Sequence, residues 1–302
     1  MAPLRSEDLI AAAKAPSTRK RYNQLWGQFE SFCTVSKKHA SPASPHTVLD
    51  YLVHLVNAEK GGSAGAALSA IKDFHLNARF ADPTQDRDVM LAAEGASRIA
   101  ADQKGWPRER DPLPVEALLS FMRSPQFTAP LGLRDATLVA IGLRLMLRPS
   151  ELVNLKLDSV KRQDGGVLVR LGRSKADQKA QRKPLLIEAS DSPACPVKLV
   201  TSLVKSRRAQ GAADGDRLFV GAAGRPLSTS AVTSVIRRMA ELHGLDPKTF
   251  SGHSLRIGGA SAALAGGLTE DQVKAVGGWK SAAVSQYLVS PKKKSVSRKM
   301  GF

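Results

Sequence analysis

Several side chains that could act on a phosphate ester stand at regular spacings in the second half of the sequence. His253 and Arg256 lie three residues apart in SGHSLRIGGA, a spacing that puts both on one face of a helix. Arg148 precedes Pro149 in LRPSELVNL, where the proline can begin a helix and leave the arginine at a surface corner. A guanidinium can hold two phosphate oxygens at once through its planar N–H groups. These residues therefore predict a phosphate site.

Each of these signals has a plainer interpretation when it is taken alone. Arg148 with Glu151 is more often a surface ion pair, and a histidine near an arginine is more often a satisfied histidine beside a solvated cation. The small residues 258–261 let either a backbone or a ligand approach closely. Tyr287 is the only tyrosine outside the first hundred residues, but a lone tyrosine more often packs in a core. The functional interpretation therefore depends on the combination of signals.

The segment LTEDQVKAVGGWKSAAVSQYL predicts where two aromatic side chains lie. Thr269 and Gln272 fit a capping box at the start of a short helix, and Gly277–Gly278 is typical of its end. Trp279 then falls in the joint between this helix and the next one. Tyr287 falls on the second helix, eight residues after the tryptophan.

The first hundred residues predict a compact helical bundle. Ser17 can cap the first helix, and apolar residues recur at helical spacing in all four. The segment DQKGWPRERDPLP is rich in proline and charge, which is typical of an interdomain linker. The predicted helices of the bundle are 18–36, 45–59, 63–79 and 86–101. The predicted domains are the bundle, 1–104, the linker, 105–113, and the second domain, 114–302, which ends in a basic tail over 290–302.

The sequence of the larger second domain predicts a mainly α fold of the α+β class. Its one β signal is a pair of apolar runs, 167–171 and 184–187, separated by a basic segment, which indicates an antiparallel hairpin with a long tip. The helices predicted around it are 114–123, 131–147, 196–209, 228–243, 252–265, 270–276 and 281–289.

Composition points to a polyanionic partner. The 302 residues include 45 Lys and Arg against 27 Asp and Glu, a net charge of +18. Residues 1–110 contribute about +3 of this charge and residues 111–302 about +15. Nucleic acid is the expected partner because a basic surface gains free energy by releasing condensed counterions, although a basic surface can also serve solubility alone.

Other functional classes find little support in the composition. Cys33 and Cys195 are far apart and show no zinc-ligand spacing, so neither a disulfide framework nor a zinc site is expected. No apolar run reaches the length of a membrane helix, and the chain does not begin with a secretory signal pattern. We expect a soluble, intracellular protein that works on DNA with no metal and no cofactor. The tail segment PKKKSVSRK is compatible with a nucleus or a bacterial cytoplasm.

Taken in order, these elements resemble the tyrosine recombinase family of phage integrases. The stretches LRPSELVNL, GRSK and SGHSLRIGG with GGWK look most like the Cre-type members found in phages and mobile elements. The resemblance covers nearly all of the chain, because the first domain looks like the family's core-binding domain. It implies that Tyr287 is the nucleophile and that Lys175 is the general acid. It also implies that Arg148 and Arg256 clamp the phosphate and that Glu151 is an orienting residue. His253 and Trp279 would be the flanking donors.

Two departures from the family pattern bear on these assignments. The spacing of eight residues from Trp279 to Tyr287 is one shorter than in many relatives, which leaves the helix phase of the tyrosine open. Lys179 and Lys183 lie in the same hairpin as Lys175, so either of them is an alternative general acid.

The resemblance also implies how the protein works with DNA. Two domains on a linker would close around the duplex as a clamp, at a specific target with inverted repeats. A homotetramer on two such sites would exchange strands through a four-way junction without ATP, and the tail would dock on a neighbouring protomer through Met300 or Phe302. The candidate DNA contacts are Lys72, Arg79 and Arg98 in the first domain and Thr229, Ser230, Arg237 and Arg238 in the second, where the two adjacent arginines could equally form a solvated face.

Two other functions remain open from the sequence. A type IB topoisomerase or a telomere resolvase shares the chemistry, but it would relax a plasmid that carries no recognition site. An inactive, domesticated DNA-binding protein would bind without forming a covalent adduct. The intact set of catalytic residue types favours an enzyme.

Overall fold

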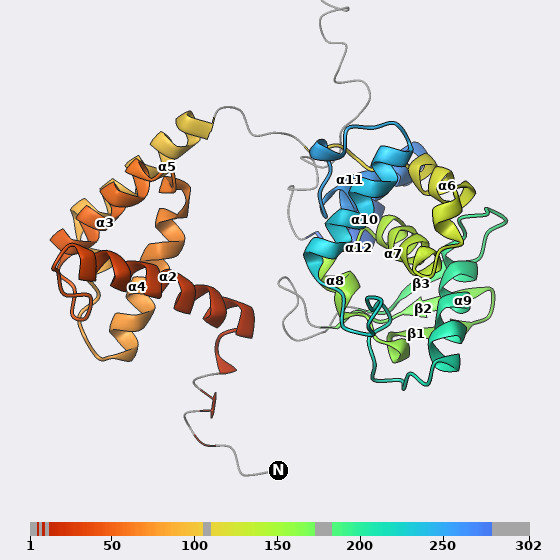
Figure 1. Cartoon of the computed structure of the whole chain (residues 1–302), viewed down its shortest axis with the longest axis horizontal. Coiled ribbons are helices and arrows are strands. Elements are labelled where there is room, and N and C mark those ends of the chain that lie inside the picture. The colour runs from red at the N-terminus through yellow and green to blue at the C-terminus, as the bar shows by residue number, and fades with distance from the viewer. Residues whose placement is uncertain (1–4, 6–7, 10–11, 105–109, 173–182, 280–302) are drawn as a thin grey trace, which may run out of the picture. The chain divides into compact units, whose positions relative to one another are not determined.

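The computed structural model describes the whole chain except residues 1–4, 6–7, 10–11, 105–109, 173–182 and 280–302. Its contacts divide the chain into two units, Met1–Pro107 and Arg108–Phe302, and this division falls inside the segment 105–113 (Figure 1).

The first unit is a bundle of α-helices whose starts follow from proline and serine. Pro45 occupies the first position of its helix, where its missing N–H is not needed, and Ser44 accepts a hydrogen bond from the N–H of Thr47. The prediction that Ser17 caps the first helix is wrong, because that helix already begins at Pro16 and has no side-chain cap. The α-helices described here are α2 (Pro16–Val35), α3 (Pro45–Asn57), α4 (Ala64–Asn77) and α5 (Arg87–Lys104).

Aromatic packing and one buried histidine hold this bundle together. Trp26 stacks on Phe74 with ring centroids 4.5 Å apart, joining α2 to α4. His75 is fully buried, and its Nε2 accepts a hydrogen bond of 2.9 Å from the N–H of Ala43. Its Nδ1 must therefore carry the proton, which it donates to the carbonyl of Ile71. A neutral imidazole thus ties the loop before α3 to α4.

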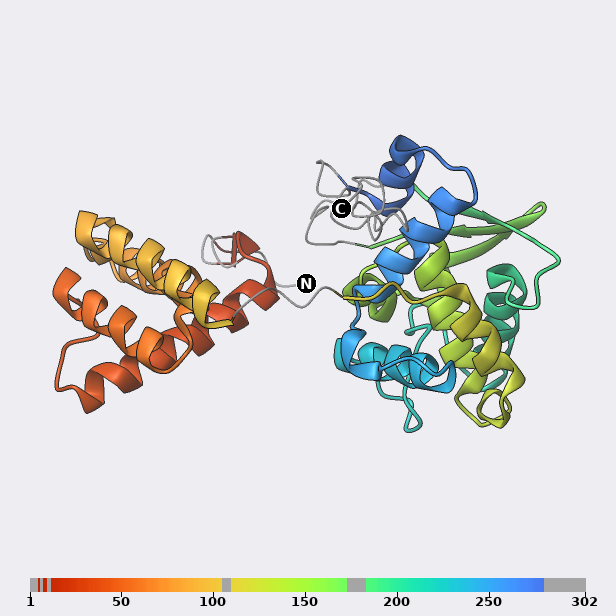
Figure 2. The same ribbon diagram turned by 90° about the horizontal axis from the view of Figure 1, so that it is seen from above.

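The second unit is built around one helix that is buried on almost every side. In α7 (Gly132–Arg144), all residues from Asp135 to Leu143 are buried, as expected for the central helix of a domain. Figures 1 and 2 show other helices packed around it. The remaining α-helices described in this unit are α6 (Val115–Arg123), α8 (Pro149–Asn154), α9 (Pro196–Ala209), α10 (Thr229–Leu242), α11 (Ser254–Ala265) and α12 (Glu270–Gly277).

A small antiparallel sheet completes the unit, in the order β1 (Val160–Gln163), β2 (Gly166–Val169) and β3 (Leu185–Glu188). Strands β2 and β3 are the predicted hairpin, paired with Val167 opposite Ile187. Strand β1 was not predicted. The mainly helical fold with a small antiparallel sheet is confirmed, and most helix ends lie within two residues of the predicted ones.

Candidate active site

Arg148 and Glu151 form a rigid corner at the start of α8. Helix α7 ends at Arg144, three residues before the predicted end, so Arg148 lies in the connection as the N-cap of α8. The carboxylate of Glu151, whose side chain is only 3% exposed, accepts the N–H of Arg148 at 2.7 Å and its Nη1 at 3.0 Å. This buried carboxylate therefore orients the guanidinium.

His253 and Arg256 differ strongly in their surroundings. Helix α11 begins at Ser254, so His253 is its N-cap rather than part of the predicted helix 252–265. The histidine is exposed, whereas Arg256 in the first turn is 2% exposed. A guanidinium so deeply buried must have its donors satisfied inside the protein.

Two segments distant in the sequence from Arg256 surround its guanidinium. Its Nη1 donates to the carbonyl of Met146, and its Nη2 donates to the carbonyl of Gly277 at 3.1 Å. Its Cζ lies 4.2 Å from the ring centroid of Trp279, which is a cation–π contact. Met146 reaches this position with φ at 52°, a conformation that is uncommon for a residue with a side chain. The structure thus joins the segments around residues 146–151, 253–256 and 277–279.

Trp279 directly follows the end of α12, while the second helix predicted over 281–289 lies outside the described residues. The capping box of Thr269 and Gln272 is confirmed, and the helix ends with Gly278 in the left-handed conformation at φ 67°. A Cβ on Gly277 would lie 1.7 Å from the Trp279 ring, so only glycine lets the indole fold back over the helix end. The glycines of α11 also permit close packing. Gly258 and Gly259 let the backbones of Leu113 and Leu143 approach the helix, so the space beside them is filled by protein and not by a ligand.

The electrostatics of His253 follow from this assembly. Partial desolvation, then the positive charges of Arg256 and Arg148, hold the pKa of the His253 imidazole below its ordinary value. The loop is also close to the α8 corner, because a Cβ on Gly252 would lie 2.2 Å from Cγ of Pro149. His253 is therefore neutral at neutral pH and can donate or accept a hydrogen bond beside two fixed cations.

Replacing Arg148 with glutamine should raise the pKa of His253, because one of the two like charges that oppose imidazolium formation is removed. The measurement is an NMR titration of the His253 ring protons in the full-length protein.

The same depressed pKa of His253 has a consequence for stability. The unfolded chain takes up a proton where the folded protein does not, so the free energy of unfolding falls as the pH drops through about 6.5 and levels off below the folded pKa.

A His253→Gln variant should lose less stability than the wild type over that interval, as measured by urea unfolding at several pH values. An unchanged His253 pKa in Arg148→Gln would show that the two side chains are not electrostatically coupled.

The other predicted site residues lie mostly outside the described part of the chain. These are Lys175, Lys179, Tyr287, Met300 and Phe302. Lys183 is described and exposed, just before β3. Sequence reasoning missed the carbonyls of Met146 and Gly277, since backbone acceptors carry no residue-type signal.

The candidate DNA contacts differ in how much of each side chain is free. Thr229 and Ser230 are exposed in the first turn of α10, which Ser228 caps. Arg238 forms an ion pair with Asp135, whose side chain is 2% exposed, and lies 5.9 Å from the Phe121 ring centroid. Arg238 therefore serves to attach α10 to α6 and α7, and we omit it from the proposed DNA contacts.

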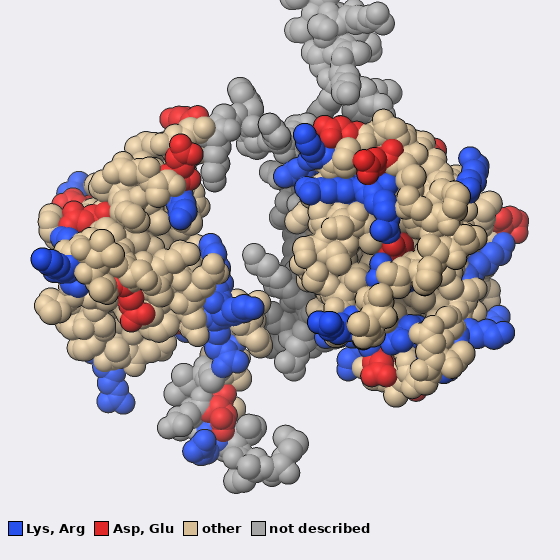
Figure 3. Space-filling model, in the orientation of Figure 1, with Lys and Arg blue, Asp and Glu red and all other residues tan. Residues whose placement is uncertain are grey.

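In the first unit, the candidate side chains are largely solvated. Lys72 lies 3.5 Å from Asp82, and Arg98 lies 3.7 Å from Glu94 with 82% of its side chain exposed. Arg79 follows the end of α4 with φ at 61°. The exposed pair of Arg98 is weak and leaves this cation able to contact a phosphate, whereas Lys72 pairs with a carboxylate whose side chain is only 8% exposed. Figure 3 shows Lys and Arg outnumbering Asp and Glu on the visible face of the second unit.

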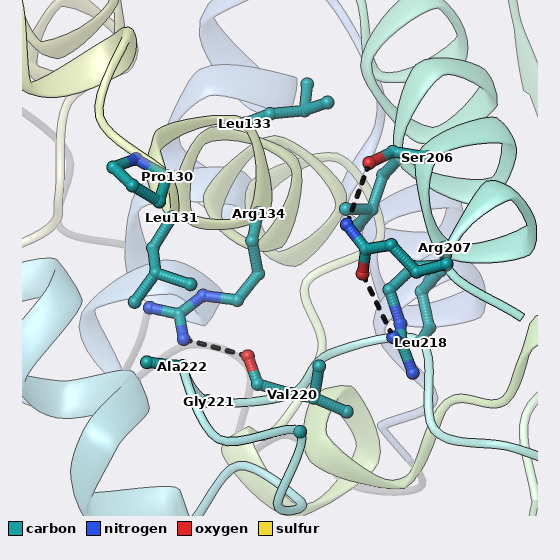
Figure 4. A pocket seen from close by; sticks show the side chains of 13 residues that line it. Pro130, Leu131, Leu133, Arg134, Ser206, Arg207, Leu218, Val220, Gly221 and Ala222 are labelled. Carbon is teal, nitrogen blue, oxygen red and sulfur yellow. Dashed lines mark hydrogen bonds between the residues drawn. The ribbon is translucent and has the colours of Figure 1, made fainter. Parts of the chain in front are cut away.

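A pocket of about 370 Å³ lies at the opposite end of α7 from Arg148. Figure 4 shows Arg134 in this pocket with its Nη1 donating to the carbonyl of Val220 at 3.0 Å. The same guanidinium also pairs with Asp135. Because Arg134 is used structurally and lies away from the His253 cluster, we do not assign this pocket to the reaction.

Within the described ranges, no three His, Cys, Asp or Glu side chains are grouped as metal ligands would be. None of the helices described is long and apolar enough to cross a membrane.

Residues 111–294, more than half of the chain, match the phage integrase family. The chain belongs to this family. The resemblance to tyrosine recombinases is thereby confirmed, and with it the class of enzyme, a site-specific recombinase that breaks and rejoins DNA strands.

Individual relatives agree with this assignment. The chain is 26% identical over 275 residues to an integrase/recombinase XerD homologue of Selenomonas ruminantium, covering 86% of this chain and 77% of that protein. It is 34% identical over 143 residues to the tyrosine recombinase XerD of Xanthomonas campestris pv. campestris, covering 47% of this chain and 42% of that protein. A crystallised lambda integrase dimer bound to a COC′ core site shares the fold, with a TM-score of 0.56, 18% identity and coverage of 93% and 92% of the two chains.

Proposed function

We propose that the protein recombines DNA at a specific site by forming a covalent 3′-phosphotyrosine intermediate through Tyr287. The observation that supports this proposal is the assembly of Arg148, His253, Arg256 and Trp279 from three distant segments. Two fixed guanidiniums beside a neutral imidazole and an indole suit one anionic group of the size of a phosphodiester.

The proposed reaction is a transesterification at phosphorus. The phenol of Tyr287 gives up its proton to solvent and its oxygen forms a bond to phosphorus. The bond from phosphorus to the 5′-oxygen breaks, and the leaving oxygen takes a proton from Lys175. Negative charge grows on the non-bridging oxygens in the pentavalent transition state, where the preoriented guanidiniums of Arg148 and Arg256 stabilise it. The number of phosphoester bonds does not change, so rejoining needs no ATP.

The remaining residues have supporting roles in this proposal. Glu151 holds Arg148 in its orientation, while His253 and Trp279 supply N–H donors toward the phosphate. Lys72, Arg79 and Arg98 of the first unit and Thr229, Ser230 and Arg237 of α10 contact the duplex. We further propose, from the family resemblance, a tetramer on two inverted-repeat sites inside the cell, with strands exchanged through a four-way junction. The XerD relative, named as a tyrosine recombinase, and the lambda integrase bound to a core site support the part of this proposal that concerns recombination on DNA.

Covalent trapping tests the proposal on many sequences at once, so the target need not be chosen in advance. The full-length protein is mixed with a pool of nicked random-sequence duplexes, and detergent-stable adducts are collected and sequenced. We expect enriched inverted repeats, a free 5′-hydroxyl that a polynucleotide kinase can label, and a phosphorylated Tyr287 peptide in mass spectrometry. Binding without any adduct would contradict the proposal and favour an inactive DNA-binding protein. Relaxation of plasmids irrespective of sequence would favour a topoisomerase.

Lys175→Ala should slow cleavage strongly on an ordinary duplex, because the 5′-oxygen then leaves without a proton donor. On a duplex with sulfur at the 5′-bridging position, the variant should cleave nearly as fast as the wild type, since a thiolate leaves without protonation. The measurement is the rate of adduct formation on both duplexes.

Lys179→Ala and Lys183→Ala are the matched controls for this experiment. If one of them shows the rescue by sulfur instead, that lysine is the general acid. A Lys175→Ala variant that is equally impaired on both duplexes would show that Lys175 is not the proton donor.

A further inference from the structure

The loop that carries His253 is attached directly to α10 through one arginine. The Nε–H of Arg237 donates to the carbonyl of Phe250 at 3.1 Å, and the Phe250 side chain is 2% exposed. Phe250 lies only three residues before His253, so this bond fixes the main chain immediately ahead of the histidine.

Local hydrogen bonds make the loop a stiff unit from that carbonyl to α11. The N–H of Ser251 donates to Oγ of Ser254 at 3.0 Å, and the N–H of His253 donates to Oγ of Ser251 at 3.3 Å. The N–H of Leu113 donates to the carbonyl of Ser254 at 3.0 Å and holds the far end. A displacement of Phe250 would therefore be transmitted to His253 rather than absorbed between them.

The same arginine faces outward along the exposed side of α10. Ser230, Ser234 and Arg237 are exposed at positions i, i+4 and i+7, so they share one face of the helix, opposite the buried Val235 and Met239. Among the described residues, the two Nη groups of Arg237 have no hydrogen-bond or ion-pair partner. One planar group can thus bind a phosphate through its Nη atoms while its Nε holds a carbonyl.

We propose that Arg237 is a positioning residue for the recombination reaction, which couples contact between α10 and the DNA backbone to the placement of His253. The inference rests on the proposed function and assigns to that site a residue that touches neither the scissile phosphate nor the nucleophile. Duplex bound along α10 engages the Nη groups, restrains the guanidinium and fixes the Phe250 carbonyl. DNA that misses this phosphate contact leaves the histidine loop less constrained.

The test compares Arg237→Lys and Arg237→Ala with Arg225→Ala. Lysine keeps the positive charge, but a single ammonium cannot hold the carbonyl and a phosphate in the same geometry. Arg225 is an exposed arginine in a turn, and within the described part of the chain its side chain makes no bond to the histidine loop, so its loss removes one charge only. Each full-length protein is assayed on the nicked duplex enriched by covalent trapping, for affinity and for the rate of adduct formation at saturating protein.

We expect Arg237→Lys to bind nearly as well as the wild type but to form the adduct between about tenfold and a hundredfold more slowly, as a displacement near 1 Å produces. Arg225→Ala should form it at the wild-type rate once bound. In the free protein, the pKa of His253 should move in both Arg237 variants and stay unchanged in Arg225→Ala, because a loosened loop changes the distance of the ring from Arg148 and Arg256.

Three results would overturn the proposal: a wild-type rate in bound Arg237→Lys, an unchanged His253 pKa in both variants, or failure of both variants to fold, which would make Arg237 a stability residue. If the wild type forms no adduct with any duplex, the proposed function fails instead. The NMR titration of His253 in the free protein then still decides whether Arg237 positions the loop.

Discussion

Replacing Tyr287 with phenylalanine should abolish the covalent adduct while leaving DNA affinity nearly unchanged. The substitution removes one oxygen atom, and that oxygen is the proposed nucleophile, whereas the ring and every cation of the phosphate site remain. The measurement is a denaturing gel of full-length protein with a nicked duplex, next to a native gel of the same mixture. We expect a complete loss of the slow band in the first gel and an intact complex in the second.

Tyr22 provides the control for this experiment. Tyr22→Phe should form adduct like the wild type, since Tyr22 lies in α2 of the first unit. Adduct that persists in Tyr287→Phe would assign the attack to another residue and would remove the proposed mechanism, although not the family membership.

Replacing Arg256 should have the largest combined effect on activity and stability. Arg256→Ala removes a proposed transition-state donor, and the loss of such a donor typically costs about 10²–10³ in rate. It also leaves the carbonyls of Met146 and Gly277 without this donor in a buried site, at about 1–3 kcal/mol for each unsatisfied group. The indole of Trp279 loses its cation–π partner as well. The expected result is an inactive protein with a clearly lower free energy of unfolding.

Arg256→Lys separates the two effects. Lysine keeps the charge but offers a single ammonium in place of the planar fork that holds both carbonyls and, as proposed, contacts the phosphate. We expect Arg256→Lys to recover part of the stability and little of the rate of adduct formation. Urea unfolding and single-turnover cleavage measure the two quantities. A wild-type rate in this variant would show that charge alone, without geometry, is sufficient at this position.

The fold was predictable from local signals except where a strand carries polar residues. Strand β1 has the sequence VKRQ with three of its four residues exposed, so it lacks the apolar alternation that indicates a strand. The turn after it did carry a signal. Asp164–Gly165 connects Gln163 to its partner Gly166, and Gly165 has φ at 73°, as expected for an Asp-Gly hairpin turn.

The candidate site was predictable in its residue types but not in its connections. The sequence shows the three-residue spacing of His253 and Arg256 and the Arg-Pro corner at Arg148, so these side chains could be proposed for one phosphate site. That Arg256 is buried while His253 is exposed depends on where α11 begins. Likewise, the adjacent Arg237 and Arg238 look equivalent in the sequence, but only the fold shows that one pairs with Asp135 and the other with a carbonyl.

The way in which Arg256 is held has a consequence for comparing homologues. Its hydrogen bonds end on main-chain oxygens, which every amino acid possesses, so these bonds require no particular side chain at residues 146 and 277. Residue 146 is constrained instead by its backbone conformation and by apolar packing with Ala260 and Val273, and residue 277 by space for the indole. Position 146 should therefore vary among homologues only toward side chains that fill this apolar cluster at positive φ. A search that scores side-chain identity alone would overlook two of the groups that hold the central cation.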